Sequence, residues 1–176
     1  MSVLEFRSFS SFFIHDKINW LIILSHILKR GAFPLKIITK ALIDDLDSII
    51  DIDIAVIGDD SRRDYMKHTI DEGRCIIVKE DNSIYGFLTY DTNFFGCTFL
   101  SLIIVSPTKR RKGHASSLIS YMLKHSPTPK IFSSTNASNE NMQKVFQANG
   151  FIRSGMIENL DEGDPELIFY IKKLRA

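Results

Sequence analysis

SLIIVSPTKRRKGHASSLISYMLKH, residues 101–125, is the stretch that decides how the rest of the chain is interpreted. It begins with an apolar run, turns at Ser106 and Pro107, crosses four consecutive cations and enters an amphipathic segment through Gly113. This order predicts a strand, a basic loop and the start of a helix. The first helical turn has backbone N–H groups without intrahelical partners, and the helix dipole adds positive potential there. We therefore expect a phosphate-bearing ligand at this point.

The spacing of the glycines and cations narrows the kind of phosphate ligand. The nucleotide P-loop and the dinucleotide-binding glycine pattern are both absent. The hexapeptide RRKGHA, from Arg110 to Ala115, matches R-x-x-G-x-A instead. With the apolar strand and Val105 ahead of it, this segment resembles the pyrophosphate loop of the GNAT superfamily of acyl-CoA-dependent N-acetyltransferases. The plain alternative is a basic, solvated start of a helix.

Composition limits the other possibilities. A chain of 176 residues with 44% hydrophobic and 24% charged residues suits one globular domain with a small extension. The formal net charge is +1, so the KRRK cluster is a local feature and we expect no nucleic-acid partner. Cys75 and Cys97 are far apart and are interpreted as core residues of a cytoplasmic protein. The five histidines show no paired ligand spacing, and we expect no metal.

The first 33 residues are interpreted as an extension with a helix at about 16–29. Its apolar stretch, 18–28, is too short for a membrane span, and its flanks do not resemble a signal peptide. We expect this helix to pack on the domain or on a second subunit, which leaves a homodimer possible. An amphipathic helix on a membrane surface is the alternative.

Residues 34–176 carry the element order that supports the resemblance. The patterns predict strands at 35–40, 74–80, 83–90, 97–105 and 130–134, helices at 43–52 and 61–71 and after Gly113, a helix capped by Ser138, and a strand from Phe151. A strand, an Asn-containing turn, a helix and Gly150-Phe151 follow the basic loop, as in GNAT proteins. The implied fold is α/β (α+β), with a mixed, mostly antiparallel central sheet of six to seven strands, about four flanking helices and the extra N-terminal helix.

The resemblance also implies a co-substrate, acetyl-CoA, in a V-shaped opening beside the strand that ends at Val105. The residues expected to bind it are Ile103, Val105, Arg110, Arg111, Lys112, Gly113, His114, Ala115, Ser116, Asn139 and Phe146. Phe146 stands where many members carry a Tyr that protonates the departing thiolate, so the general acid is unknown. A thiol with a pKa of about 8.5 needs little protonation to leave near neutrality.

The acceptor side is less defined. An attacking alkylamine with a pKa of about 10.4 must lose a proton first. The strand 97–106 contains no acid, and the nearest acids lie in the segment 158–166. Glu158 is predicted to orient the amine or act as the base, and Asp59, Tyr85, Glu158 and Asp161 are the expected substrate contacts. The alternatives are a solvated acidic turn, a helix cap at Asp59 and strand packing of Tyr85.

Together these features predict an N-acetyltransferase that transfers an acetyl group from acetyl-CoA to a primary amine by direct attack in a ternary complex. The acceptor is a small-molecule amine or a protein amino group. A non-catalytic acyl-CoA-binding sensor or structural module is the alternative. A nucleic-acid binder that uses the KRRK cluster is a further one, and it would bind less tightly as salt rises.

Overall fold

The computed structural model describes residues 36–173. The chain divides between Leu35 and Lys36 into two units, and the described residues all belong to the second unit. The predicted helix at 16–29 lies outside the described residues, and the predicted boundary at residue 34 stays a prediction. No helix within 36–173 is long and apolar enough to cross a membrane.

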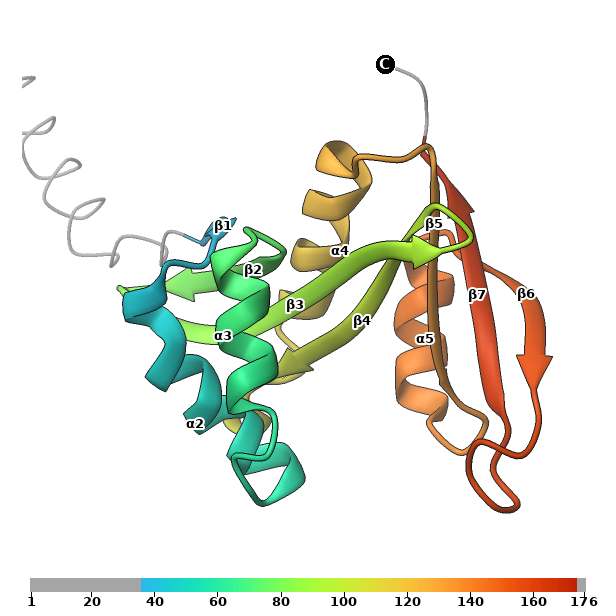
Figure 1. The fold of residues 1–176 in the computed structure, drawn as a ribbon, viewed down its shortest axis with the longest axis horizontal. Coiled ribbons are helices and arrows are strands. Elements are labelled where there is room, and N and C mark those ends of the chain that lie inside the picture. The colour runs from blue at the N-terminus through green and yellow to red at the C-terminus, as the bar shows by residue number, and fades with distance from the viewer. Residues whose placement is uncertain (1–35, 174–176) are drawn as a thin grey trace, which may run out of the picture. The chain divides into compact units, whose positions relative to one another are not determined.

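The helices and strands of the described chain follow one another in an order close to the predicted one. The elements are β1 (Ile37–Lys40), η1 (Ile43–Asp45), α2 (Leu46–Ile57), α3 (Arg63–Asp71), β2 (Cys75–Glu80), β3 (Ser83–Phe94), β4 (Cys97–Val105), η2 (Pro107–Lys109), α4 (His114–His125), β5 (Lys130–Asn136), α5 (Glu140–Ala148), β6 (Ile152–Ile157) and β7 (Glu166–Lys172). Figure 1 shows their arrangement.

The strands form one sheet of seven in the order β1-β2-β3-β4-β5-β7-β6. Every neighbouring pair is antiparallel except β4 and β5, which run parallel. The predicted mixed, mostly antiparallel sheet with four flanking helices is therefore confirmed in the described residues. The parallel pair is made possible by α4, which carries the chain back between the two strands.

Two tight turns fix the register of the central hairpins. Asp81 and Asn82 both have positive φ, 49° and 62°. Two-residue turns with positive φ at both central residues have a backbone twist that matches the twist of the antiparallel strands they join. Phe95 and Gly96 repeat this conformation between β3 and β4, with φ of 52° and 70°. The strand predicted to end at residue 90 continues as β3 to Phe94, so only Phe95 and Gly96 lie between the paired residues Phe94 and Cys97.

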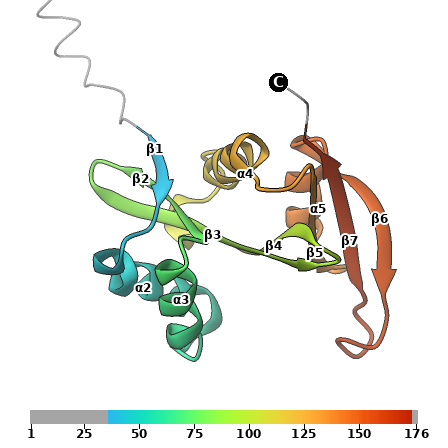
Figure 2. The ribbon, with the colours of Figure 1, turned by 45° about the horizontal axis from the view of Figure 1, so that its top comes forward.

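Helices cover the sheet from both sides, and each side has its own core (Figure 2). On one side, α4 and α5 bury side chains such as Leu118 and Phe146 against Leu88, Leu100 and Phe169 of the sheet. On the other side, α2 and α3 cover β2, β3 and β4. The residues packed there are Ile49, Ile50, Met66, Ile70, Cys75, Ile77, Phe87 and Ile104.

Two helix boundaries differ from the sequence prediction. The helix expected at 43–52 begins as the single turn η1 and continues as α2 to Ile57, where Gly58, with φ of 96°, ends it. The prediction that Ser138 caps the helix α5 is wrong. Asn139 is the N-cap, because its Oδ1 accepts a hydrogen bond from the Met142 amide at 3.1 Å.

Candidate active site

An opening in the sheet separates the two parallel strands. β4 and β5 pair at three positions, Thr98 with Ile131, Phe99 with Phe132, and Leu100 with Ser133. The Ser133 hydroxyl donates to the Leu100 carbonyl at 2.8 Å and closes the apex. Beyond this point, the edge of β4 facing β5 has no strand partner among residues 36–173. Backbone N–H and C=O groups on such an edge can bind an extended ligand.

The helix N-terminus beside this opening has the features of an anion site. Gly113 is the N-cap of α4 and gives it no side-chain hydrogen bond, so the first amides of the helix remain available as donors. Gly113 has φ of 77°, and no atom lies within 4 Å of where its Cβ would be. Arg111 also has positive φ, 61°, which turns the loop before the helix. The loop is therefore open in front of the helix, as a phosphate would require.

The cations of the loop do not all point the same way. Arg110 Nε donates to the Val105 carbonyl at 3.2 Å and ties the loop to the end of β4. Lys109 Nζ lies 4.4 Å from the centre of the Tyr85 ring, a cation–π geometry. Tyr85 also contacts the His114 ring edge to face, with centroids 5.6 Å apart. The packing alternative therefore accounts for Tyr85, whose predicted substrate contact stays a prediction.

His114, predicted to lie in the cofactor loop, is buried beneath it. Its side chain is 1% exposed, and neither ring nitrogen has a hydrogen-bond partner among the described residues. Burial lowers the pKa of His114, with Lys36 adding to the effect and Glu80, whose Oε1 lies 3.8 Å from Nδ1, opposing it. The ring is thus held neutral below the loop, and its contribution to an anion site is its backbone N–H.

This burial predicts a pH dependence of stability. Because the folded pKa of His114 lies below its unfolded value, the unfolded chain takes up a proton first as pH falls below about 6.5. The free energy of unfolding should therefore be lower at pH 5.5 than at pH 7.5. His114→Gln should show a weaker dependence, because its side chain cannot be protonated. Urea unfolding of both proteins at the two pH values measures this dependence. An equal change in the free energy of unfolding between pH 7.5 and pH 5.5 for the two proteins would contradict the prediction.

The acidic segment 158–166 leads from β6 into β7, and two of its acids form hydrogen bonds within the fold. Asp164 accepts hydrogen bonds from the Ser138 hydroxyl at 2.6 Å and from the Ser138 amide at 2.9 Å, and these bonds lower the pKa of Asp164. Asp161 Oδ2 accepts from Asn136 Nδ2 at 2.6 Å. These two acids hold the turn between β5 and α5. Glu158 is exposed just after β6, and its role stays a prediction.

Three other predicted residues have structural partners. Asp59 Oδ1 accepts from the Ser61 amide at 3.0 Å, a bond that belongs to the turn between α2 and α3. Asn139 uses its Oδ1 to cap α5. Phe146 is 1% exposed and packs against Phe151 and Phe169, with ring centroids 5.3 and 4.9 Å away. A side chain buried this deeply offers almost no surface to a cofactor.

The sequence analysis missed two residues at the apex of the opening. The register passes from Tyr90 opposite Leu100 to Thr89 opposite Leu102, so Ser101 is an extra residue in β4, a β-bulge. Its hydroxyl donates to Asp91 Oδ2 at 3.0 Å. The strand 97–106 carries no acid of its own, but the neighbouring strand supplies one. The hairpin register, which pairs Asp91 with Phe99, is the signal that could have revealed it.

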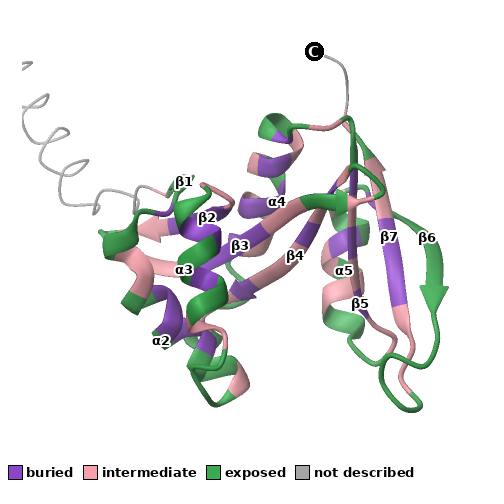
Figure 3. Ribbon diagram, viewed as in Figure 1, coloured by how far each residue is buried: buried purple, intermediate pink, exposed green. Residues whose placement is uncertain are grey.

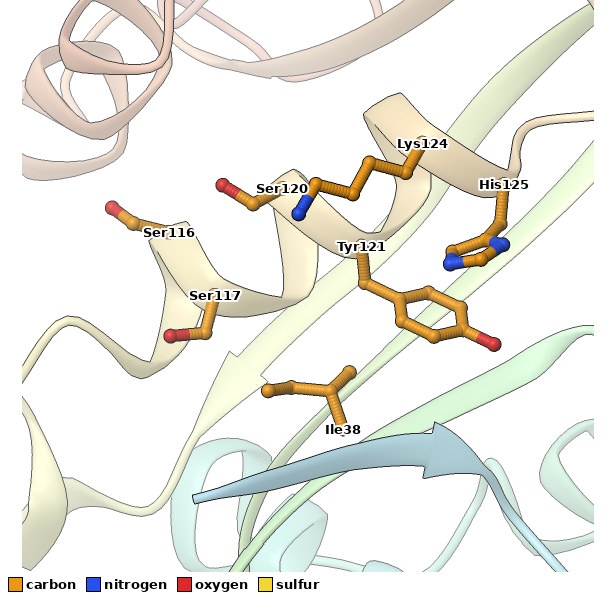
Figure 4. A pocket seen from close by; sticks show the side chains of 7 residues that line it. All are labelled: Ile38, Ser116, Ser117, Ser120, Tyr121, Lys124 and His125. Carbon is orange, nitrogen blue, oxygen red and sulfur yellow. The ribbon is translucent and has the colours of Figure 1, made fainter. Parts of the chain in front are cut away.

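A pocket of about 440 Å³ lies on α4, between this helix and β1 (Figure 4). Its lining consists of Ile38, Ser116, Ser117, Ser120, Tyr121, Lys124 and His125. Ser116 belongs to the predicted cofactor loop, and its hydroxyl accepts from Asn149 Nδ2 at 3.0 Å. The pocket therefore begins at the helix N-terminus and continues along α4 with hydroxyl groups and the ammonium of Lys124.

Comparisons with known proteins agree with this geometry. The sequence model of the acetyltransferase (GNAT) family matches residues 44–151. The crystal structure of a GNAT-family acetyltransferase from Bacillus cereus ATCC 10987 is 82% identical in sequence, covers 80% of this chain and 99% of its own, and superposes with a TM-score of 0.79. No curated protein matches significantly.

More distant structures share the fold. The ribosomal-protein-S18-alanine N-acetyltransferase of Escherichia coli is 14% identical over 81% of this chain and 96% of its own, with a TM-score of 0.70. YncA of Salmonella typhimurium, a putative acetyltransferase solved with its cofactor acetyl-CoA, is 11% identical over 80% of this chain and 95% of its own, with a TM-score of 0.66.

The chain belongs to the GNAT family of acetyltransferases. The family prediction made from the basic loop is confirmed. Membership supports acetyltransferase activity in general, with acetyl-CoA as the family's acetyl donor.

Proposed function

We propose that this chain is an N-acetyltransferase that moves an acetyl group from acetyl-CoA to a primary amine, which attacks directly in a ternary complex. The observation that carries the proposal is the position of the unpaired edge of β4 directly before the uncapped N-terminus of α4. The loop 106–113 joins these two features. The edge of β4 offers backbone hydrogen-bonding groups to an extended, amide-bearing arm, and the N-terminus of α4 offers backbone N–H groups to an anion.

The residues of this segment divide the work of binding. The pyrophosphate would lie on the backbone N–H groups from Arg111 to Ser116, with Arg110 fixing the loop against Val105. The pantetheine arm would pair with β4 at Ile103 and Val105. Lys36 Nζ donates a hydrogen bond to the Lys112 carbonyl at 3.2 Å and holds the backbone of the loop at this point. The ammonium group of Lys112 would add positive potential near the pyrophosphate.

Catalysis would depend on position and on backbone polarity. Holding the amine and the thioester together removes the entropy cost of their encounter. Backbone N–H groups near the apex would polarise the thioester carbonyl. A thiolate with a pKa of about 8.5 leaves without a strong acid, which agrees with a phenylalanine at position 146.

The proposal is tested by calorimetric titration of the full chain with acetyl-CoA, followed by thiol release against a panel of amines in the same preparation. We expect binding and amine-dependent release. The absence of binding would contradict the site, and release without an amine acceptor would indicate hydrolysis rather than transfer.

The second candidate function, an acyl-CoA-binding module without turnover, is favoured by one observation. Phe146 provides no proton, and it is packed in the core instead of facing the opening. Binding of acetyl-CoA without release on any amine, small or peptidic, would support this function over catalysis.

Glu158 provides a test of the acidic segment. Glu158→Gln should raise the apparent KM for a cationic amine about two- to threefold, because one exposed charge contributes roughly 0.5 kcal/mol. The value of kcat should not change. Steady-state kinetics at low salt measures the effect, with Asp71→Asn, an exposed acid at the end of α3, as the control. An unchanged KM would leave Glu158 as part of a solvated turn.

A further inference from the structure

One half of a sheet face carries no helix. Within residues 36–173, α2 and α3 cover β2, β3 and β4 on their side, whereas β5, β7 and β6 have no helix in front of them on that side (Figure 1). On β5, buried Ile131 and Ser133 face α4 and α5, so Phe132 between them points to the uncovered side. Burial alternates along β5, whereas β6 is exposed along its whole length, as Figure 3 shows.

Aromatic side chains line this uncovered side. Phe99 pairs with Phe132, and Phe132 pairs with Tyr170, so the three lie side by side across β4, β5 and β7. The rings of Phe132 and Tyr170 are 5.0 Å apart, and Phe94 contacts Phe99 at 5.0 Å and Phe132 at 5.1 Å. We call Phe94, Phe99, Phe132 and Tyr170 the aromatic row. All four are half-buried, so each keeps surface for a partner.

At its β4 end, the aromatic row adjoins Asp91 of β3, close to where the pairing of β4 with β5 stops. Asp91 is opposite Phe99 in the register and binds the Ser101 hydroxyl. It is on the same side as the row, because Thr89, two residues earlier, bonds to Tyr65 of α3 at 3.1 Å. The carboxylate therefore lies next to Phe99 on the β3 side of β4, and its partner Ser101 directly follows Leu100, the last residue of β4 that pairs with β5.

The charge at this point has no counterpart in the described chain. Among residues 36–173, no Lys, Arg or His forms an ion pair with Asp91. Its Oδ1 accepts from the Asn93 amide at 2.8 Å, which fixes the direction of the carboxylate. A fixed carboxylate beside aromatic rings is complementary to an ammonium group on an apolar body.

We propose that this face binds the acceptor, and that the acceptor is a small primary amine with an aromatic or other apolar body. Asp91 and Ser101 hold its amino group at the apex, and the aromatic row covers its body. This assignment rests on the proposed acetyl transfer, since it places the nitrogen beside the edge of β4 that would carry the thioester. The aromatic row and Asp91 together favour an amine with an apolar body, whereas the acidic segment 158–166 favours only a positive charge.

The test compares 2-phenylethylamine with ethanolamine as acceptors for the full chain. We expect kcat/KM to favour 2-phenylethylamine at least tenfold. Phe132→Ser should reduce this preference to less than threefold, and Phe132→Leu, which keeps an apolar surface, should retain most of it. Asp91→Asn should lower kcat/KM for both amines about thirtyfold, mainly through KM, with the affinity for acetyl-CoA unchanged. Asp51→Asn, at an exposed position of α2, makes the same chemical change as a control.

The outcomes separate this inference from the proposed function. Thiol release with both amines at similar rates, unaffected by the Phe132 and Asp91 variants, would overturn the inference and leave N-acetylation standing. Release with neither amine nor any other would remove the proposed function, and calorimetric binding of 2-phenylethylamine would then still test the face by itself. A change from dimer to monomer in sedimentation of Phe132→Ser would show that a second copy covers the row, which would also overturn the inference.

Discussion

Gly113→Trp should lower the affinity for acetyl-CoA by more than a hundredfold. The position has φ of 77° and open space where a Cβ would lie, so an indole there would project into the volume in front of the first amides of α4. Losing two charge-assisted hydrogen bonds to a phosphate costs roughly 3–6 kcal/mol, which corresponds to a factor of at least a hundred. Calorimetric titration with acetyl-CoA measures the change.

Gly96→Trp is the matched control for this variant. Gly96 also has positive φ, 70°, and no atom within 4 Å of its Cβ position, but it lies in the hairpin between β3 and β4. Both substitutions carry a similar backbone penalty, so circular dichroism and melting should show similar losses. If Gly113→Trp is folded and binds acetyl-CoA as the parent does, the loop is not the phosphate site.

Gly86→Ala should destabilise the fold by about 2–3 kcal/mol and lower Tm by roughly 5–10 °C. A Cβ at Gly86 would lie 2.7 Å from the Ile104 carbonyl oxygen and 3.2 Å from Val105 Cα. These are backbone atoms of β4 that cannot move without shifting the strand. Because the same strand would carry the pantetheine arm, affinity for acetyl-CoA should fall together with stability. Thermal melting and calorimetry measure the two effects.

Gly155→Ala is the control for Gly86→Ala, because it adds the same methyl group at a position without close neighbours. Gly155 lies in β6 with no atom within 4 Å of its Cβ position, and its φ is not in the left-handed region. The substitution should be neutral or stabilise the protein by up to about 1 kcal/mol, because alanine restricts the unfolded chain. Equal losses for the two variants would mean that the contact at β4 does not explain the need for Gly86.

Local patterns predicted most of the fold, because each depends on residues near in sequence. The helix start at Gly113 and the helix end at Gly150 were visible as turn and cap signals, and the strands predicted at 74–80 and 83–90 left only residues 81–82 for the turn between them. The β-bulge at Ser101 was not visible, because an extra residue in one strand is defined only by its pairing with another. Asp91 was missed for the same reason, since its position at the apex depends on the register of β3 against β4.

The cofactor loop and the acceptor side differ in how far sequence could define them. The loop is one continuous segment around Gly113, so its motif carries its geometry. The proposed acceptor site combines residues of β3, β4, β5 and β7, which meet only in the folded sheet. Acidic composition favoured the segment 158–166, where Asp161 and Asp164 have structural partners. The acid beside the opening came instead from a strand dominated by apolar residues.

The short parallel contact between β4 and β5 has a mechanical consequence. In the described chain, three residue pairs join the part of the sheet formed by β1 to β4 to the part formed by β5, β7 and β6. Under the proposed function, an acetyl donor in the opening would contact both parts, and its binding free energy would then add to the stability of the folded sheet. The donor would thus stabilise the fold of the protein that binds it.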